Sequence, residues 1–359
     1  MIATTPIKVV ELAYLRYIDL FARICSPDGG THMQCWPRNH GVMVLARMTQ
    51  FLFVFIAATG TQLALAQSSR DIIGAASLGS GYSQIVNLTA TPDISSAHLR
   101  VSDGAVPQSF TVTRIPYEGS LFKFSDRDSV DWRVSAGYFR EKDDLPITVP
   151  DGSMGSISSK WSAFSATGGL VLKSRLGYGF TFEPALDFSV VRLLNDASYA
   201  GVASSLKPAA DGPLFNWHEN AFVITPNAAL EWTTSIASAQ TLTIRGHIAW
   251  SWLSSFDESD PILRFRETAG AWSIQSTYVG PAGIQLLSRP LSYVVNAGYG
   301  GFFGPNHDAL GFSTIANIGA GFELPFARDN PQSKRLRVGA AYLFGPHVEG
   351  WTVSLGLTY

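Results

Sequence analysis

The last nine residues, Trp351–Tyr359, read WTVSLGLTY and alternate strictly between apolar side chains and small or polar ones. A period of two is the pattern of a β-strand with one apolar face and one polar face. The segment has the length of a transmembrane strand, which needs about 9–11 residues. Tyr359 would place an aromatic ring at the boundary between membrane and water. Because soluble sheets also alternate, the decisive question is whether the pattern is repeated upstream.

The same alternation recurs in six earlier segments, near 178–190, 222–233, 242–252, 291–303, 312–324 and 335–344. These segments are longer than the roughly 5–6 residues of an average soluble strand. Their charged residues fall on the face that carries Gly and small side chains, whereas the inner face of a sandwich would carry large apolar groups. The pattern therefore predicts an apolar face turned toward lipid and a polar face turned inward.

These segments predict an all-β fold, namely a closed antiparallel up-and-down transmembrane β-barrel of about 12 strands within residues 94–359. Further strands are expected near 108–117 and 130–140, and one more at either 94–102 or 119–126. Counting back from a periplasmic C-terminus places the long loops 141–159 and 194–219 outside the cell and the short turn 174–176 in the periplasm, as membrane barrels require.

The N-terminal part divides into three segments. Residues 1–42 are an unexplained extension, either a misassigned start or a long basic leader. Residues 43–66 are a predicted signal peptide with Arg47, an apolar core at Phe51–Ala58 and a small-residue cleavage pattern at Ala64–Ala66. A short anchor helix is the alternative interpretation. Residues 67–93 form a lumen plug or a periplasmic tail.

The composition excludes several partners. A net charge of −2 gives no basic surface for nucleic acid. Both cysteines, Cys25 and Cys35, lie in the N-terminal extension and lack paired CxxC spacing, so no metal site is expected. No cofactor is expected either.

The candidate functional residues are charged or polar side chains on the inward face. One interpretation is a pore whose charges set selectivity, and the other is an ion-pair network that seals and stiffens the barrel. These lumen-facing candidates are Arg133, Glu183, Asp187, Glu231, Arg245, His247, Glu323, Arg335 and Arg337.

Aromatic residues gather near the predicted strand ends, where they are expected to form girdles at the two membrane interfaces. The principal candidates are Trp232, Trp250, Trp252, Trp351 and Tyr359. Others in the same pattern are Trp132, Tyr138, Trp161, Tyr178, Trp272, Tyr278, Tyr293 and Tyr342.

No catalytic residue is predicted. A barrel lipase or deacylase would need a His-x-Ser pair, and no histidine after residue 66 has Ser two positions later. Asp143-Asp144 and His307-Asp308 both lie in predicted outer loops, but their spacing does not match an omptin-like protease.

The closing segment YLFGPHVEGWTVSLGLTY, residues 342–359, and the strand count resemble the translocators of autotransporters. Because nearly all residues after the predicted signal peptide are assigned to the barrel, which leaves no room for a passenger, the chain resembles solitary outer-membrane autotransporter-like β-barrels over roughly residues 95–359. The resemblance implies a location in the outer membrane of a Gram-negative bacterium and assembly by the barrel assembly machinery. It also implies contact with membrane lipid and lipopolysaccharide, and a role as a small pore or structural surface protein. The alternatives are an outer-membrane barrel hydrolase and a soluble secreted β protein; the oligomeric state is left open.

Overall fold

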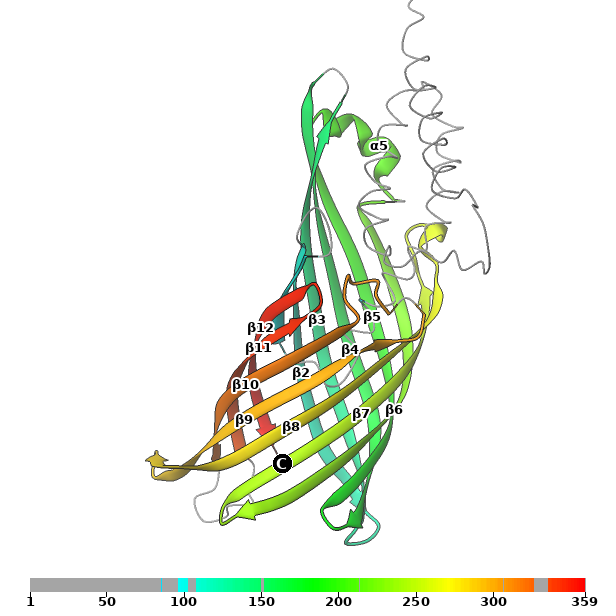
Figure 1. Cartoon of the computed structure of the whole chain (residues 1–359). Helices are drawn as coiled ribbons and strands as arrows, with labels where there is room; N and C mark the ends of the chain where they lie inside the picture. Colours follow the sequence, from blue (N-terminus) through cyan, green and yellow to red (C-terminus); the bar gives the residue numbers. More distant parts are fainter. Residues whose placement is uncertain are drawn as a thin grey trace, which may run out of the picture.

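The computed structural model describes Ile85 and residues 96–102, 108–149, 152–212, 214–305, 307–325 and 335–358. They form a closed antiparallel barrel in which each strand pairs with its neighbours in sequence and β1 pairs with β12 (Figure 1). The strands are β1 Ser96–Val101, β2 Gln108–Lys123, β3 Asp128–Thr148, β4 Met154–Gly177, β5 Phe180–Gly201, β6 Trp217–Ala237, β7 Gln240–Phe256, β8 Arg266–Leu286, β9 Arg289–Phe303, β10 Thr314–Pro325, β11 Arg335–Gly345 and β12 Val348–Thr358.

The predicted fold class is confirmed. Of the two possible positions for the first strand, 94–102 is correct, because residues 119–126 instead contain the end of the long strand β2. The predicted segments 1–42 and 43–66, most of 67–93, and Tyr359 lie outside the described residues. Among the described residues, no helix is long and apolar enough to cross a lipid bilayer.

The alternation in sequence becomes an alternation between the two sides of the wall. On β11, Val338 and Phe344 point outward with 47% and 43% of their surfaces exposed, whereas Ala341 and Leu343 point inward and are buried. Neighbouring strands repeat the pattern, and the outward side carries the exposed apolar belt. Consecutive strand residues point to opposite faces, so the period of two sets which side chains meet lipid.

The two ends of the barrel differ. One end, here called the base, carries the short connections 124–127, 178–179, 238–239 and 287–288 and the end of β12. The opposite end, here called the mouth, carries the two longest connections, 202–216 and 304–313. In membrane barrels the long loops face the cell exterior and the short turns face the periplasm. By this rule, the mouth corresponds to the outer end of a membrane barrel.

Three strands rise beyond the rest of the wall at the mouth. β3, β4 and β5 extend past their neighbours, and the short helices η1 (Val202–Leu206) and α5 (Lys207–Ala210) lie beside them (Figure 1). A small apolar cluster joins these parts through Ile157, Ala203 and Phe215. The extension is thus a packed structure with its own core outside the membrane.

The inner face is not polar throughout. Near the mouth, inward side chains of nearly every strand join one apolar cluster, which we call the mouth cluster. It includes Leu263 and Phe265 from the loop that contains η2 (Pro261–Leu263), and Phe312 from the β9–β10 connection. The expectation of a wholly polar lumen holds only below this cluster.

At two aromatic positions, the structure contradicts the prediction that the side chain faces lipid. Trp161 was expected at the membrane interface, but it points inward and packs edge-on against Trp217 at 5.2 Å between ring centroids. Phe312 was expected on the outward face of a strand, but it precedes β10 and is buried in the mouth cluster. Both residues are apolar because they pack against other apolar side chains outside the bilayer, not because they contact lipid.

Candidate functional site

The lumen below the mouth cluster is crossed by ion pairs between strands. Arg133 on β3 donates two hydrogen bonds to the Asp187 carboxylate on β5, at 2.7 and 2.5 Å. Asn227 on β6 accepts from Arg133 at 2.9 Å and donates to Asp187 at 2.8 Å. A bidentate pair with an additional amide partner satisfies a buried carboxylate, which would otherwise be costly. His247 lies beside this group, 3.4 Å from the Asn227 carbonyl oxygen.

A second ion-pair group joins β10 and β11 near the base. Glu323 accepts from Arg335 at 2.7 Å through one carboxylate oxygen and from Arg337 at 3.0 and 2.7 Å through the other. Only 3% of the Glu323 side chain is exposed, so the carboxylate is held almost entirely by its two partners. The register explains the arrangement, because Glu323 is directly opposite Arg337.

The remaining predicted lumen residues lie on β5, β6 and β7. Arg245 on β7 donates to Glu183 on β5. Between them on β6, Glu231 is directly opposite Arg245 and accepts from the Thr233 hydroxyl at 3.4 Å. These contacts make an ordered polar row across three strands.

A third ion-pair group was missed by the sequence analysis. Lys173 on β4 pairs with Glu118 on β2 and, at 3.0 Å, with Asp131 on β3. Arg114 on β2 donates to the Ser135 hydroxyl at 2.7 Å. Asp131 lies two residues before the predicted Arg133, so extending the same alternation by one step would have found it.

The outward aromatics lie along the apolar wall. Trp252 and Trp351 are 50% and 63% exposed. Trp351 packs against Tyr342 at 4.9 Å between ring centroids, Trp250 against Phe303 at 5.5 Å, and Trp232 against Phe180 at 6.3 Å. Tyr359, the fifth principal candidate, is not among the described residues.

One carboxyl group lies within the mouth cluster. Glu219 on β6 is fully buried, and neither carboxylate oxygen has a hydrogen-bond partner among the described residues. The outward apolar run of β6 begins at Phe222, so Glu219 lies beyond the membrane-spanning part. Burial raises the pKa of Glu219 to about 8. The Ser255 hydroxyl opposes this rise, and the nearby Glu258 carboxylate adds to it. The site therefore favours the protonated, neutral form of Glu219.

Hydrogen bonds hold the β7–β8 loop, residues 257–265, in place near Glu219. Ser255 exchanges hydrogen bonds with Phe265 across the loop, and Ser259 does so with His218 on β6. These ties hold Leu263 and Phe265 inside the mouth cluster. The loop therefore adds two apolar side chains to the inner face of the barrel at the mouth.

The residues considered for an omptin-like protease lie on different elements, with Asp143 and Asp144 on β3 and His307 and Asp308 in the β9–β10 connection. Asp143 and Asp144 are consecutive residues of β3, so their side chains point to opposite faces of the strand. Asp144 pairs with Lys142 at 3.3 Å, and the His307 ring contacts the Gly304 carbonyl at 3.2 Å. In the described part of the chain, no cluster of three His, Cys, Asp or Glu residues could hold a metal ion.

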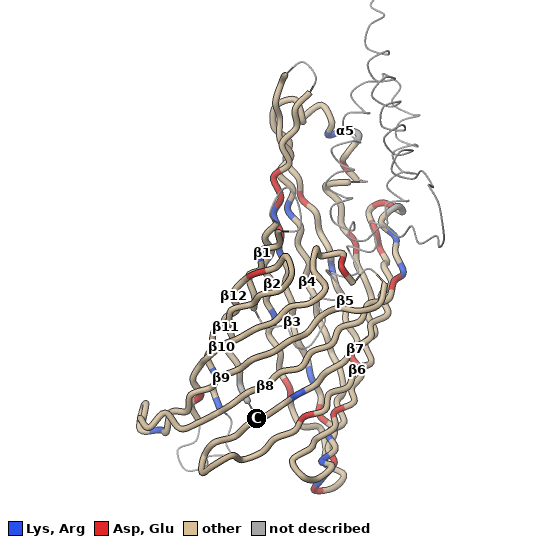
Figure 2. Tube along the Cα trace, viewed as in Figure 1, with Lys and Arg blue, Asp and Glu red and all other residues tan. Residues whose placement is uncertain are grey.

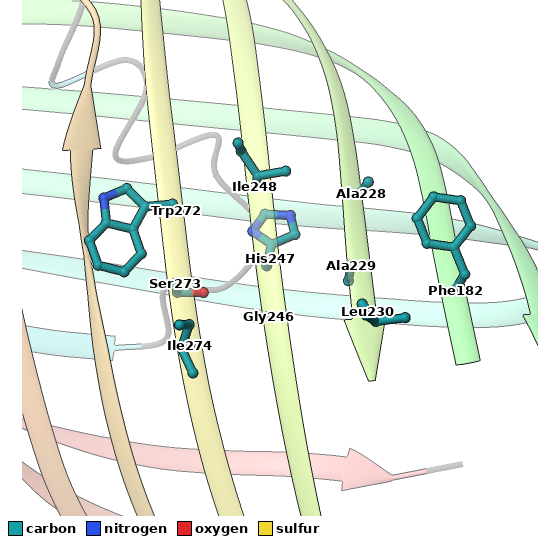
Figure 3. A pocket seen from close by; sticks show the side chains of 10 residues that line it. All are labelled: Phe182, Ala228, Ala229, Leu230, Gly246, His247, Ile248, Trp272, Ser273 and Ile274. Atoms are coloured by element: carbon teal, nitrogen blue, oxygen red, sulfur yellow. The ribbon is translucent and has the colours of Figure 1, made fainter. Parts of the chain in front are cut away.

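The wall carries a recess at Gly246. Its lining includes Phe182, Leu230, Ile248 and Ile274, from four adjacent strands (Figure 3). A Cβ atom built on Gly246 meets no atom within 4 Å, which shows that the glycine leaves the space open. The four side chains belong to the exposed apolar belt, so the recess is a place for lipid chains.

Comparison with known proteins identifies the type of barrel. The family described as the solitary outer membrane autotransporter beta-barrel domain matches residues 102–357. No curated protein matches the chain.

Several solved barrels resemble the structure. The translocator domain of autotransporter NalP from Neisseria meningitidis is 10% identical with a TM-score of 0.49; the match covers 73% of this chain and 84% of that one. The β domain of the Bordetella autotransporter Brka is 13% identical with a TM-score of 0.45, covering 74% and 95%. The transport unit of autotransporter AIDA-I from Escherichia coli is 13% identical with a TM-score of 0.43, covering 78% and 97%.

Proposed function

The chain belongs to the family of solitary outer membrane autotransporter β-barrel domains, and from this premise we propose that it is a barrel whose lumen is closed at rest. In this proposal it serves the outer membrane of a Gram-negative bacterium as a structural surface protein, with no catalytic activity. The exposed apolar belt and the position of the long connections support this assignment.

The mouth cluster is the observation that carries the proposal. Phe110 on β2 packs against Phe139 on β3 at 5.5 Å and against Phe312 at 6.3 Å between ring centroids. Phe302 on β9 contacts Phe312 at 5.9 Å, so rings from separate parts of the wall meet through a residue of the connecting loop. An apolar constriction of this kind excludes water and therefore ions.

The ion pairs below the mouth cluster support a closed barrel rather than a selective pore. Selectivity by charge requires a ring of one sign. Here three of the lumen carboxylates have a cation beside them: Asp187 has Arg133, Glu183 has Arg245 and Glu323 has Arg337. Neutralised pairs that join neighbouring strands stiffen the wall and leave little field to attract a solute.

Single-channel recording in planar bilayers tests the proposal. Wild-type protein, folded as judged by heat-modifiable migration, should show no sustained conductance steps. Phe110→Ala combined with Phe312→Ala should produce discrete openings, because it removes a stacked ring pair from the mouth cluster. Phe164→Ala, which removes an outward ring that is 50% exposed, is the matched control and should stay closed. Regular steps from the wild type, unchanged in the double variant, would overturn the proposal.

A further inference from the structure

A row of basic side chains lies on the outer surface of the wall near the mouth. We call Arg100 (β1), Arg140 (β3), Lys160 (β4) and Arg192 (β5) the basic rim. The residues on either side of Arg100 and Arg192 point inward and are buried. Leu99 and Val101 flank Arg100, and Val191 and Leu193 flank Arg192. All four basic side chains therefore face the surroundings of the barrel, and charged segments are visible on these strands in Figure 2.

The sheet register brings the basic rim together. On β2, Ser109 is opposite Arg100 and Thr111 is opposite Arg140. The β2 positions that pair with these two rim residues are therefore two residues apart. Lys160 is directly opposite Lys142. From β1 to β5 there are four strand spacings, so the rim spans about 19 Å across the strands. Along the strands the register offsets its members by up to four residues, or about 13 Å. All four lie on one side of the barrel.

The side chains of the basic rim are not held in ion pairs with other described residues. None of its four side chains forms an ion pair or side-chain hydrogen bond among the described residues, whereas the adjacent Lys142 is bound to Asp144. In the register, Glu349 is directly opposite Arg100 and Asp196 is directly opposite Lys160, so Arg140 and Arg192 are the two rim cations with no carboxylate directly opposite them. Like charges on adjacent strands are unfavourable unless an anion lies between them.

Directly below the basic rim, the wall is apolar and aromatic. Phe164 is opposite both Tyr138 and Arg192 in the register, and its ring lies 4.8 Å from that of Tyr138. Farther down the same face of β5, Phe188 and Val190 are 51% and 43% exposed. Cations above and apolar rings below match an amphiphile with an anionic head.

We propose that the basic rim binds the phosphate groups of an outer-leaflet glycolipid, whose acyl chains lie along β3, β4 and β5. Guanidinium groups suit phosphate because they donate paired hydrogen bonds in a fixed plane. The proposal rests on the orientation given under the proposed function, since the mouth must face the outer leaflet. It adds a defined lipid site to a barrel otherwise surrounded by general membrane contacts.

Native mass spectrometry of the folded barrel in neutral detergent, titrated with diphosphoryl lipid A, tests the proposal. Wild-type protein should retain the lipid in the presence of EDTA. Arg140→Ala combined with Arg192→Ala should weaken binding by about tenfold, because two charge-assisted contacts are lost. Arg266→Ala is the matched control: it removes an exposed outward cation at the same end on β8 and should bind as wild type does.

The phosphate requirement is tested with two further probes. Dephosphorylated lipid A and phosphatidylcholine should bind the wild type no better than the double variant. Equal retention of all three lipids, or equal loss of diphosphoryl lipid A in Arg266→Ala, would overturn the proposal. Heat-modifiable migration shows that each variant is folded. Bilayer conductance is measured separately, so failure of the lipid site is distinguishable from failure of the closed-lumen proposal.

Discussion

Arg133 and Asp187 form their ion pair across an intervening strand, directly over Gly169. The register places Gly169 of β4 opposite Arg133 on one side and opposite Asp187 on the other. A Cβ atom built on Gly169 would lie 2.0 Å from an Asp187 carboxylate oxygen. Because Gly169 has no side chain, the Arg133 guanidinium can pass over it and reach the Asp187 carboxylate.

Gly169→Ala should therefore destabilise the barrel. The methyl group would displace the Asp187 carboxylate, which is 1% exposed, and leave a buried charge poorly paired. We expect a loss of about 2–4 kcal/mol in the free energy of unfolding, measured by denaturant titration of the folded, heat-modifiable form. Gly168→Ala is the control, because a Cβ atom at the neighbouring outward position meets nothing within 4 Å. Equal effects of the two substitutions would refute this explanation.

Glu323 should matter more to stability than either of its partners. Glu323→Ala leaves Arg335 and Arg337 without their shared carboxylate, and we expect a loss of about 3 kcal/mol. Arg335→Ala removes one partner while Arg337 still neutralises the carboxylate, so its cost should be about 1 kcal/mol. Denaturant titrations of both variants give the comparison. If Arg335→Ala costs as much as Glu323→Ala, the carboxylate is not the centre of the group.

Sequence alternation predicted the strands and the faces of the wall because one period of two governs both. From the sequence alone, the alternation placed Arg337 on the inner face of the wall and Val338 on the outer face. It could not predict which charges meet, since Arg133 and Asp187 are 54 residues apart and pair over an intermediate strand. That pairing depends on strand stagger, which a period of two does not encode.

The mouth was less predictable than the wall. Leu263 and Phe312 lie in connections with no strand period, so nothing in their local sequence shows that they fold into the lumen. Trp161 was wrongly predicted to lie at the lipid interface, because aromatic residues near strand ends are also typical of that interface. Outside the bilayer the same residue type serves ordinary burial, and only position relative to the membrane distinguishes the two roles.

Glu219 should make the stability of the barrel depend on pH. Its pKa is raised from 4.5 to about 8 in the folded protein, so the folded state holds a proton that the unfolded chain releases. Stability should therefore fall as pH rises between these values, by at most about 5 kcal/mol in total. Thermal unfolding of wild type and Glu219→Gln from pH 5 to pH 9 measures the effect.

The glutamine variant should be less sensitive to pH and more stable than the wild type at pH 9. Glu141, outside the membrane belt on β3, also has a pKa raised to about 8 by burial, so part of the dependence should remain. Glu141→Gln identifies that part. The double variant should keep only a smaller dependence at the acidic end of the range, because burial also raises the pKa of Asp143 to about 6. Parallel curves for wild type and Glu219→Gln would show that Glu219 is ionised in the folded barrel.

Gly350 should be essential for closing the barrel. It lies on β12 opposite Leu99 of the six-residue strand β1, and a Cβ atom there would be 2.1 Å from the His98 carbonyl oxygen. Gly350→Ala would push β12 away from this short strand, and overpacking of this kind costs about 1–3 kcal/mol. Gly356→Ala, farther along β12 with nothing within 4 Å of its Cβ, should fold normally. Heat-modifiable migration after refolding compares them; a normal yield for Gly350→Ala would mean that closure tolerates a wider β1–β12 spacing.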